Sequence, residues 1–470
     1  MRSLMFAIAV FIPALVTVST AQSISFVKER CGRLYVDNKP YYFVGANYWY
    51  GSLLGIEKDR QHGLQRLRLE LDLLKKNGVT NLRLMAGAEG TGILNGVMRV
   101  GPPIQPRQGE FDETVLRGLD LVLSEMGRRN MKAVIYLSNN WEWSGGFQQY
   151  LLWNHAIGDE FIAKKPDWDE LRDTVAKFYT CEPCMNDYRR QVHFIVGRTN
   201  TFNRKRYAED PAIMAWEMAN EPRPMRPAAN EAYVAFLRSA SAAIKIDDPN
   251  HLVTTGHEGW IGTESVSLFE NVHSDPNIDY VTIHIWPKNW GWFENGKLDE
   301  GFSGAVERSV EYVNSNVPTA EKLGKPIVIE EFGLPRDGQS LEISSTTQRR
   351  DEFYKRILSF VGDKNIAGAN FWAFAGFARP VRGQSFWKSG DDRTGDPPME
   401  EQGLNSVFDS DLSTLAVVRS EGRRAKELSK RRLASLAGPA CSSSQKTKIR
   451  GSESIVPYRT RARNAALNTM

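Results

Sequence analysis

One arrangement recurs along the chain: a short β-branched or apolar run that ends in polar or aromatic residues, followed by an amphipathic stretch. Eight such runs predict strands at residues 42–48, 79–85, 132–138, 212–219, 251–255, 280–285, 326–330 and 367–373. Between them, apolar residues recur at three- and four-residue spacing, the signature of a helix, at 64–76, 114–128, 231–244, 305–323 and 348–361. Strands that alternate with helices indicate parallel βαβ units.

Eight βαβ-type units predict an α/β fold, a (β/α)8 TIM barrel with long loops in a single domain. A doubly wound open sheet is the alternative. The polar residues at the strand ends favour the barrel, because its strands bring their carboxyl ends to one face, whereas an open sheet spreads them along an edge. These residues are Asn47, Trp49, Arg83, Asn139, Asn140, Trp141, Asn220, Glu221, His257, Glu258, His284, Trp286, Glu331 and Trp372.

The charge of the chain is unevenly distributed. Its 470 residues include 60 Lys and Arg against 56 Asp and Glu, a net charge of +4. Residues 419–470 hold 13 basic and 3 acidic residues, a net +10, so residues 1–418 carry −6. The basic character therefore belongs to the end of the chain, and it gives no reason to expect a nucleic-acid partner for the barrel.

The sequence predicts that the chain consists of a signal peptide, one catalytic domain and a carboxyl-terminal tail. Residues 1–21 begin with a basic residue, continue through an apolar run broken by Pro13 and end in small residues, which is typical of a cleaved secretory signal peptide. The alternative, a membrane anchor, is disfavoured because the run is short for a bilayer span. The barrel domain is expected at 25–435, and the Ser-rich, basic segment 436–470 is expected to be a disordered tail. The mature protein is then secreted, has no membrane contact and is expected to be a monomer.

The four cysteines are too few for a disulfide-built fold. Cys181 and Cys184 form a CxxC pattern, which fits either a local disulfide or half of a zinc site. Because a second CxxC is missing, the sequence favours the disulfide. The pairing of Cys31 and Cys441 stays open.

Two acidic segments follow apolar strands 110 residues apart: AWEMANEPR, with Asn220 and Glu221, and PIVIEEFG, with Glu330 and Glu331. Cleavage of a glycosidic bond needs one carboxylic acid that protonates the leaving oxygen and one carboxylate at the anomeric carbon. Because side chains alternate along a strand, only one of Glu330 and Glu331 can face the mouth of the barrel. A single Glu after a strand is usually an ordinary residue exposed to solvent. Here both acidic segments follow buried strands and are accompanied by Asn, His, Arg and Trp residues at other strand ends, which favours a functional site.

Tryptophan is abundant after the predicted strands, where core packing does not require it. Flat indole rings offer stacking surfaces to the C–H face of a sugar. A single loop Trp more often packs than binds, yet the clustering favours sugar binding for several of them: Trp49, Trp141, Trp143, Trp153, Trp260, Trp286, Trp290, Trp292, Trp372 and Trp387.

At these residues the chain resembles glycoside hydrolase family 5, and within it the secreted endo-β-1,4-mannanases of the subfamily 7 type. The segments that carry the resemblance occur in the family order over about residues 25–418: FVGANYWYG, NLRLMAG, LSNNWEWSGG, AWEMANEPR, TTGHEGW, VTIHIWPKNWGWF, PIVIEEFG and NFWAFAG. The resemblance implies that Glu221 is the acid/base and Glu331 the nucleophile. No cofactor and no metal are implied.

The resemblance also implies a set of substrate-binding residues. Asn220 would hold the sugar 2-hydroxyl, Arg83 would support the ionised nucleophile, His284 would hydrogen-bond in the −1 subsite and Trp372 would form the platform under the −1 sugar. Trp286 departs from the pattern, since many members carry Tyr at this position. Asn140 and Trp141 replace the His of many family cellulases, as in mannanases.

The implied reaction is retaining hydrolysis of β-1,4-mannosidic bonds in mannan, glucomannan or galactomannan by double displacement, with the two carboxyl groups roughly 5–5.5 Å apart. A β-1,4-glucanase or mixed-specificity hydrolase on the same barrel is an alternative, because fold fixes chemistry better than substrate. A non-catalytic polysaccharide-binding barrel is a remote alternative, since it would have little need of both Glu221 and Glu331.

Overall fold

The structure, a computed structural model, describes residues 25–56 and 60–430. The expected signal peptide, the tail at 436–470 and Cys441 lie outside these residues. None of the helices in the described part of the chain is long and apolar enough to cross a membrane.

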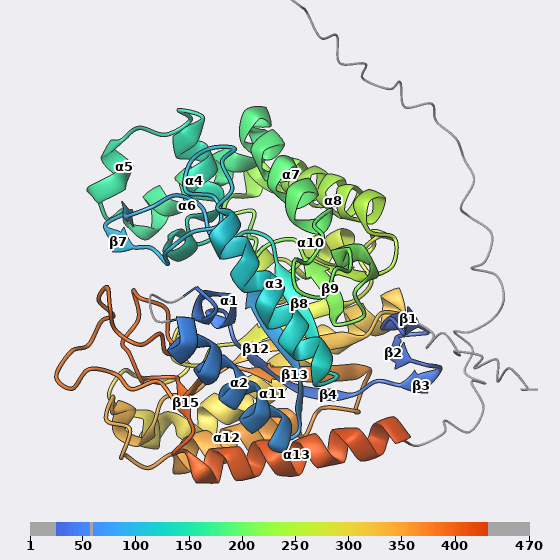
Figure 1. Ribbon diagram of the computed structural model, residues 1–470, viewed down its shortest axis with the longest axis vertical. Coiled ribbons are helices and arrows are strands. Elements are labelled where there is room, and N and C mark those ends of the chain that lie inside the picture. Colours follow the sequence, from blue (N-terminus) through green and yellow to red (C-terminus); the bar gives the residue numbers. More distant parts are fainter. Residues whose placement is uncertain (1–24, 57–59, 431–470) are drawn as a thin grey trace, which may run out of the picture. The chain divides into compact units, whose positions relative to one another are not determined.

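Eight parallel strands form the central sheet at the predicted places (Figure 1). They are β4 (Phe43–Asn47), β5 (Val79–Met85), β8 (Lys132–Tyr136), β9 (Ile213–Glu217), β10 (Leu252–Thr254), β11 (Val281–Ile285), β12 (Ile327–Phe332) and β13 (Ile366–Phe371). Their order in the sheet is β10-β9-β8-β5-β4-β13-β12-β11. Almost every residue in these strands is buried, because one face fills the interior of the sheet and the other packs under helices.

The two edge strands, β10 and β11, meet across a seam. The amide of Asp279 donates to the carbonyl of Val253 at 2.8 Å, and Thr254 Oγ1 donates to the carbonyl of Tyr280 at 3.0 Å. These bonds bring the edges of the sheet together into a near-closed barrel. The predicted (β/α)8 TIM barrel is therefore confirmed, and the open sheet is wrong.

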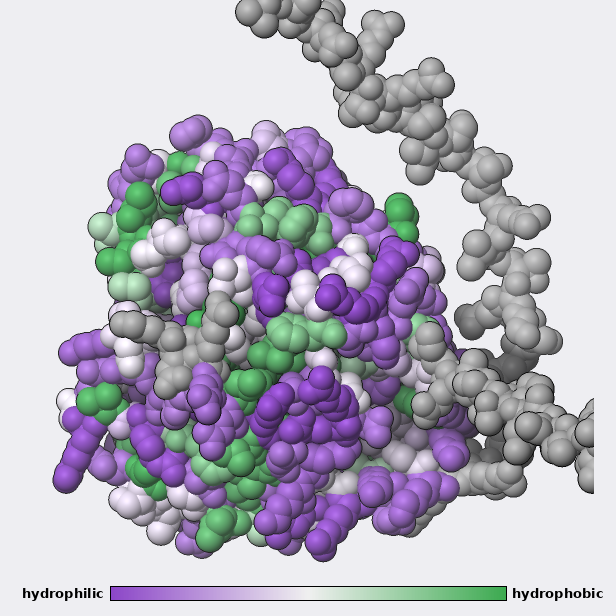
Figure 2. Space-filling view, viewed as in Figure 1, coloured by the Kyte–Doolittle hydropathy of each residue, from purple (hydrophilic) through white to green (hydrophobic). Residues whose placement is uncertain are grey.

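Helices surround the barrel, and the five predicted ones are present with slightly different ends. The larger helices are α2 (Arg60–Lys76), α3 (Glu113–Arg128), α7 (Glu182–Val196), α8 (Asn230–Asp247), α10 (Val266–His273), α11 (Leu298–Leu323), α12 (Gln348–Leu358) and α13 (Leu412–Lys430). In Figure 1, α7, α8 and α10 lie on one side of the barrel, and α2, α11, α12 and α13 lie on the other. The face in Figure 2 is largely hydrophilic with scattered apolar patches, as expected where these helices turn their polar sides to water.

The basic last helix has a structural reason for its charge. Arg424 donates to the carbonyls of Leu358 and Val361, both at 2.7 Å, at the carboxyl end of α12. Arg419 donates to Asn77 Oδ1 at 2.8 Å. Orphaned carbonyls at a helix end favour cationic partners, so these arginines fix α13 against the barrel.

Long segments follow the strands at their carboxyl ends. The segment between β8 and α7 holds α4 (Gly146–Trp153), α5 (Glu160–Ala163) and α6 (Trp168–Ala176). The segment after β13 holds the small strands β14 (Phe374–Gly376) and β15 (Val407–Phe408), which pair with each other. The remaining strands and α-helices of the described residues are β1 (Lys28–Arg30), β2 (Arg33–Val36), β3 (Lys39–Pro40), α1 (Gly51–Leu54), β6 (Ile93–Leu94), β7 (Val97–Met98) and α9 (Trp260–Thr263).

Cys181 and Cys184 are joined in a disulfide. Cys181 is the residue that precedes α7, so the bond closes the first turn of this helix. The predicted local disulfide is confirmed, and the zinc alternative for this pair is wrong.

Candidate active site

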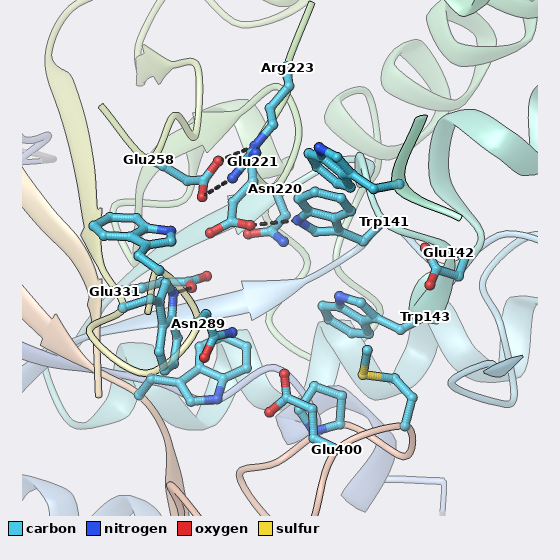
Figure 3. A pocket seen from close by; sticks show the side chains of 16 residues that line it. Trp141, Glu142, Trp143, Asn220, Glu221, Arg223, Glu258, Asn289, Glu331 and Glu400 are labelled. Carbon is cyan, nitrogen blue, oxygen red and sulfur yellow. Dashed lines mark hydrogen bonds and ion pairs between the residues drawn. The ribbon is translucent and has the colours of Figure 1, made fainter. Parts of the chain in front are cut away.

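The side chains predicted to carry chemistry meet at the carboxyl ends of the strands, as a barrel requires. They surround a pocket with a volume of about 440 Å³. Its lining is dominated by acidic and indole side chains: Trp141, Glu142, Trp143, Trp168, Asn220, Glu221, Arg223, Glu258, Trp286, Asn289, Trp290, Glu331, Trp372, Pro397, Met399 and Glu400. Figure 3 shows Glu221 and Glu331 in the middle of this pocket, with Arg223 at one end and Glu400 at the other.

Glu221 and Glu331 lie close enough to act on one bond. His284 Nδ1 lies 2.7 Å from Glu221 Oε1 and 3.3 Å from Glu331 Oε2, so a single imidazole nitrogen touches both carboxyl groups. One oxygen of each Glu and this nitrogen all lie within 4.8 Å of one another. A spacing near 5 Å is that of retaining glycosidases, whereas inverting enzymes leave about 6.5–9.5 Å for a water molecule.

Glu331 is held at the end of β12 by two donors. Arg83, from β5, forms an ion pair with Glu331 Oε1, and the Trp286 indole donates to Glu331 Oε2 at 3.0 Å. The guanidinium is fixed in turn by Glu217, which accepts from Arg83 Nη2 at 2.6 Å and from Nε at 2.8 Å. A charge-assisted fork of this kind orients Arg83 so that a donor points at Glu331.

Glu221 has a different set of partners. The Trp141 indole donates to Glu221 Oε2 at 2.5 Å, and its other oxygen meets His284. The backbone of Glu221 has a φ of 51°, in the left-handed region that non-glycine residues rarely adopt. Its amide donates to the carbonyl of Gly256 at 2.9 Å, which helps to hold this conformation. A strained backbone that is held in this way is often found at functional sites.

The surrounding residues shift the pKa values of Glu221 and Glu331. Burial raises the pKa of Glu221, while Arg223 and the Trp141 hydrogen bond act against the rise. Burial also raises the pKa of Glu331, where Arg83 opposes the rise and the negative charge of Glu221 adds to it. Two close, buried carboxyl groups favour sharing one proton. The direct contact with Arg83 favours the ionised form of Glu331.

The imidazole between the two acids is neutral. Burial lowers the pKa of His284 to about 3, and the positive charge of Arg83 contributes to the decrease. A neutral imidazole can hydrogen-bond to the acids without placing a second full positive charge beside Glu331. The Glu221–His284–Glu331 group could also present three ligand atoms to a metal ion, but the guanidinium already seated on Glu331 disfavours a cation there.

Glu330 lies below the pocket rather than in it. It is fully buried, and its carboxyl group lies 3.9 Å from Arg83 Nε and 4.0 Å from His284 Nε2. Among the described residues, neither carboxyl oxygen of Glu330 has a hydrogen-bond partner. Burial and the negative charge of Glu217 hold the pKa of Glu330 well above its usual range, which favours the uncharged form of this buried carboxyl group.

The remaining predicted residues divide into two groups. Trp141, Asn220, Trp286 and Trp372 line the pocket. Arg83, His284 and Asn140 are fully buried behind its surface. Asn220 Oδ1 accepts from Arg83 Nη2 at 2.7 Å. Asn140 Oδ1 instead accepts from the backbone amide of Arg223 at 3.2 Å, so it shapes the loop after β9 rather than the pocket surface.

The Trp residues also divide. Trp141, Trp143, Trp286, Trp290 and Trp372 line the pocket. Trp49 is 2% exposed and donates to the carbonyl of Gly395 at 2.8 Å, so it packs the long segment between β14 and β15. Trp153, Trp260, Trp292 and Trp387 do not line the pocket.

Several pocket residues were missed by sequence reasoning. Arg223 was not predicted, although its position just after a strand was available as a signal. It forms an ion pair with Glu258, one of the predicted strand-end residues, with two contacts of 2.5 Å. Glu400 comes from an irregular segment and Trp168 is the first residue of α6, and neither follows one of the predicted strands. Burial, the charge of Asp396 and that of Glu221 raise the pKa of Glu400 to about 8.

Comparison with known proteins identifies the family to which this chain belongs. Residues 24–430 match a family model described as "GH family 5 beta-mannosidase-like". The chain belongs to glycoside hydrolase family 5. The resemblance to glycoside hydrolase family 5 is thereby confirmed, and the protein is a glycoside hydrolase.

Individual relatives cover most of this family 5 chain. Mannan endo-1,4-beta-mannosidase 1 of Oryza sativa subsp. japonica is 27% identical over 426 residues, which span 86% of this chain and 87% of the relative. Mannan endo-1,4-beta-mannosidase 1 of Arabidopsis thaliana is 30% identical over 62% of this chain and 67% of its own length. The solved structure of a glycoside hydrolase family 5 mannosidase from Rhizomucor miehei is 32% identical, with a TM-score of 0.76 over 87% of this chain and 99% of that one.

Proposed function

We propose that this family 5 hydrolase cleaves internal β-1,4-mannosidic bonds of mannan-type polysaccharides with retention of anomeric configuration. One observation carries the proposal: Glu221 and Glu331 present oxygens within 4.8 Å of each other in a Trp-lined pocket at the carboxyl ends of the strands. Relatives that are named mannan endo-1,4-beta-mannosidases support the choice of substrate.

Each carboxyl group has a task that its surroundings favour. Glu331, ionised beside Arg83, attacks the anomeric carbon and forms a glycosyl ester, while Glu221 gives its proton to the departing sugar oxygen. In the second step, ionised Glu221 takes a proton from water, and the hydroxide oxygen attacks the anomeric carbon and releases Glu331. The enzyme thus returns to one proton on Glu221 and one charge on Glu331.

The surrounding residues position the sugar and the acids. Asn220 and the Trp372 ring border the space above Glu331, where the sugar undergoing attack would lie, and they would hold its 2-hydroxyl and its C–H face. The Trp286 indole supplies the hydrogen bond to Glu331 that Tyr supplies in many family members. No step of this reaction needs a metal ion or a cofactor.

A second candidate is a β-mannosidase that removes single sugars from chain ends. Glu400 lies at the end of the pocket opposite Arg223 (Figure 3), and its side chain would limit the sugars held on the side away from the leaving group. The 32% identical Rhizomucor miehei protein is titled a mannosidase, which is consistent with this alternative.

Product analysis tests both candidates. The enzyme is incubated with mannan, glucomannan and carboxymethyl-cellulose, and reducing ends are measured together with the viscosity of each solution. An endo-mannanase releases reducing ends from the first two and lowers viscosity early. Release of mannose alone at nearly constant viscosity would favour the mannosidase, and release from carboxymethyl-cellulose alone would overturn both candidates.

We also propose that the protein is secreted through its first 21 residues. The sequence pattern of this segment supports export, as does the polysaccharide substrate, which lies outside cells. Amino-terminal sequencing of the protein recovered from a culture medium should begin after Ala21. Retention of the full-length chain inside the cells would contradict this assignment.

A further inference from the structure

Glu89 is a buried carboxyl group that the proposed reaction does not use. It follows β5 and is 0% exposed. Its Oε1 accepts from Gln191 Nε2 at 2.6 Å and from the Tyr150 hydroxyl at 3.1 Å. The Ser138 hydroxyl donates to the same oxygen at 3.3 Å, and the amide of Gly146 donates to Oε2 at 2.9 Å. Four donors from β8, α4 and α7 and their connections therefore converge on one side chain.

The surroundings of Glu89 decide its charge. Burial raises the pKa of Glu89 to about 7, and the four donors act against the rise. The ionised carboxylate, which predominates above this pH, is the form that all four donors stabilise. Arg99 donates to the backbone carbonyl of Glu89 at 3.2 Å rather than to its carboxyl group. The other titratable groups near Glu89 are Tyr136, Tyr150 and Tyr188.

The Gly146 amide belongs to a tight turn that follows β8. Gly145 and Gly146 have φ values of 95° and 56°, in the left-handed region that glycine adopts readily. A Cβ atom on Gly145 would clash with the carbonyl oxygen of Glu89, and one on Gly146 would clash with that of Asn139. The amide of Glu89 donates to the carbonyl of Ser144 at 2.8 Å. The turn is therefore held between Glu89 and Asn139.

Asn139 connects this turn to the indole that touches Glu221. Its Nδ2 donates to Ser144 Oγ at 3.0 Å, and its Oδ1 accepts from the backbone amide of Trp141 at 3.0 Å. The Trp141 indole donates to Glu221 Oε2 at 2.5 Å (Figure 3). A continuous chain of contacts thus leads from Glu89, through the turn, to the hydrogen-bond donor of the proposed acid.

Asn220 also contacts Asn139, but it is fixed from a second side. Its Nδ2 donates to Asn139 Oδ1 at 3.1 Å, while its Oδ1 accepts from Arg83 Nη2 at 2.7 Å. Trp141 has the Arg223 guanidinium 5.1 Å from its ring, a contact with the face of the ring that leaves the direction of the N–H within the ring plane to the backbone. The turn therefore matters most for Trp141.

We propose that Glu89 is a positioning residue, which holds the turn at 138–146 so that the Trp141 indole donates to Glu221. The inference rests on the proposed function, because only a reacting Glu221 gives this hydrogen bond a catalytic consequence. Glu89 does not line the pocket, so it acts through Trp141 and not on the sugar.

Glu89→Gln is the variant that tests this role, since it keeps the shape of the side chain. A carboxylate offers two acceptor oxygens, whereas an amide offers one oxygen and one N–H₂ donor. Whichever way the amide turns, its N–H₂ faces either the Gly146 amide or Gln191 Nε2, and both are donors. Two donors that face each other in a buried place repel, so the turn must shift.

Asp120→Asn is the matched control. Asp120 is also 0% exposed, and it accepts from Arg198 Nη2 and from the Tyr207 hydroxyl, both at 2.7 Å. It belongs to α3 and does not line the pocket. Asp120→Asn therefore reports what the loss of a buried carboxylate does to the enzyme when the turn is untouched.

The first readout does not depend on catalysis. The enzyme is labelled with ¹⁵N-tryptophan, and the indole N–H resonance of Trp141 is identified by its loss in Trp141→Phe. We expect this resonance to move upfield in Glu89→Gln, because the hydrogen bond to a carboxyl group weakens, and to keep its position in Asp120→Asn. An unmoved Trp141 resonance in folded Glu89→Gln would overturn the proposal.

The second readout is the alkaline limb of the kcat/KM profile on mannan. The Trp141 hydrogen bond lowers the pKa of Glu221, so its loss should move the alkaline limb to higher pH by about one unit. The acid limb is not compared, because Glu89 itself titrates near pH 7. Glu89→Gln replaces none of the charged and titratable groups that face Glu221, which are Arg83, Arg223, Glu258, His284, Glu331 and Glu400.

A double variant separates positioning from general damage. Trp141→Phe should shift the alkaline limb as Glu89→Gln does, and the variant with both substitutions should show no further shift, because both act on one hydrogen bond. Asp120→Asn should leave the limb in place. Shifts that add in the double variant, or an equal shift in Asp120→Asn, would overturn the positioning role.

A milder variant covers the case in which Glu89→Gln does not fold. Ser144→Ala interrupts the same chain at Asn139 Nδ2, and a shift of the alkaline limb by about half a unit in the same direction is expected. No shift of the limb and no change of the Trp141 resonance in Ser144→Ala would overturn the proposal. A wild-type enzyme that does not cleave mannan would instead overturn the proposed function, while the indole resonance would still test the link between Glu89 and Trp141.

Discussion

Two layers of glutamates lie at the carboxyl end of the barrel, and they differ in what they face. Glu221 and Glu331 line the pocket, whereas Glu217 and Glu330 are completely enclosed beneath it. Both layers contact Arg83, the first through Glu331 and the second through Glu217. A carboxyl group with a strongly shifted pKa is therefore not by itself a reacting group. Only the carboxyl groups that line the pocket can reach the substrate, and those beneath it support them.

The two neighbouring residues of β12 give the strongest contrast. Glu331→Gln should reduce turnover on mannan by at least about 1,000-fold, because an amide is not a nucleophile at the anomeric carbon. Glu330→Gln should cost less than about tenfold, since the neutral amide, like the uncharged acid that its raised pKa favours, adds no second negative charge beside Glu217. Initial rates and thermal unfolding midpoints of both variants check this. If both variants are folded and lose turnover equally, Glu331 and Glu330 do not differ in role, and the proposed division into reacting and supporting glutamates is wrong.

A second contrast lies within the reacting layer. Glu221→Ala should reduce turnover on mannan by about 100- to 10,000-fold, the contribution typical of general acid–base catalysis. With an aryl β-mannoside whose phenolic leaving group needs no proton, the first step should proceed at nearly the wild-type rate. A burst of phenol followed by slow turnover is therefore expected in stopped-flow measurements. The same loss on both substrates would argue against Glu221 as the acid.

The smallest effect concerns the indole that supports Glu331. Trp286→Phe removes the donor to Glu331 Oε2, which stabilises the ionised form, so the pKa of Glu331 should rise by about one unit. Activity is lost as pH falls and Glu331 becomes protonated, and it is also lost as pH rises and Glu221 ionises. The acid limb of the kcat/KM profile should therefore move to higher pH in the variant, while the alkaline limb stays. A shift of the alkaline limb alone would contradict these assignments.

Much of the fold was predictable, because buried strands and helices have apolar residues at regular spacings in the sequence. The eight strands were predicted to within three residues at each end, since each is a buried apolar run bounded by polar residues. The alternation of side chains along β12 also predicted that only one of Glu330 and Glu331 faces the pocket, and Glu331 is that residue. The CxxC disulfide followed from the absence of a second CxxC.

Two pocket residues that were not predicted, Glu400 and Trp168, lie in long segments away from the predicted strand ends. Glu400 belongs to the long segment between β14 and β15, whose path depends on contacts such as Asp396 accepting from the amides of Gly403 and Asn405. Trp168 is placed by the ion pairs of α6 with loops distant in sequence. Such positions are set by tertiary contacts, which a single sequence does not display.

The central claim is that Glu331 forms a covalent bond with the sugar. The most direct measurement is mass spectrometry of the enzyme after reaction with a 2-deoxy-2-fluoro-β-mannosyl fluoride, whose electron-poor sugar slows the release of the intermediate. The account predicts one added fluoromannosyl group, located on Glu331 in the peptide that contains PIVIEEFG. A label on Glu330 or Glu221, or cleavage of mannan by an enzyme that never becomes labelled and yields inverted products, would contradict it.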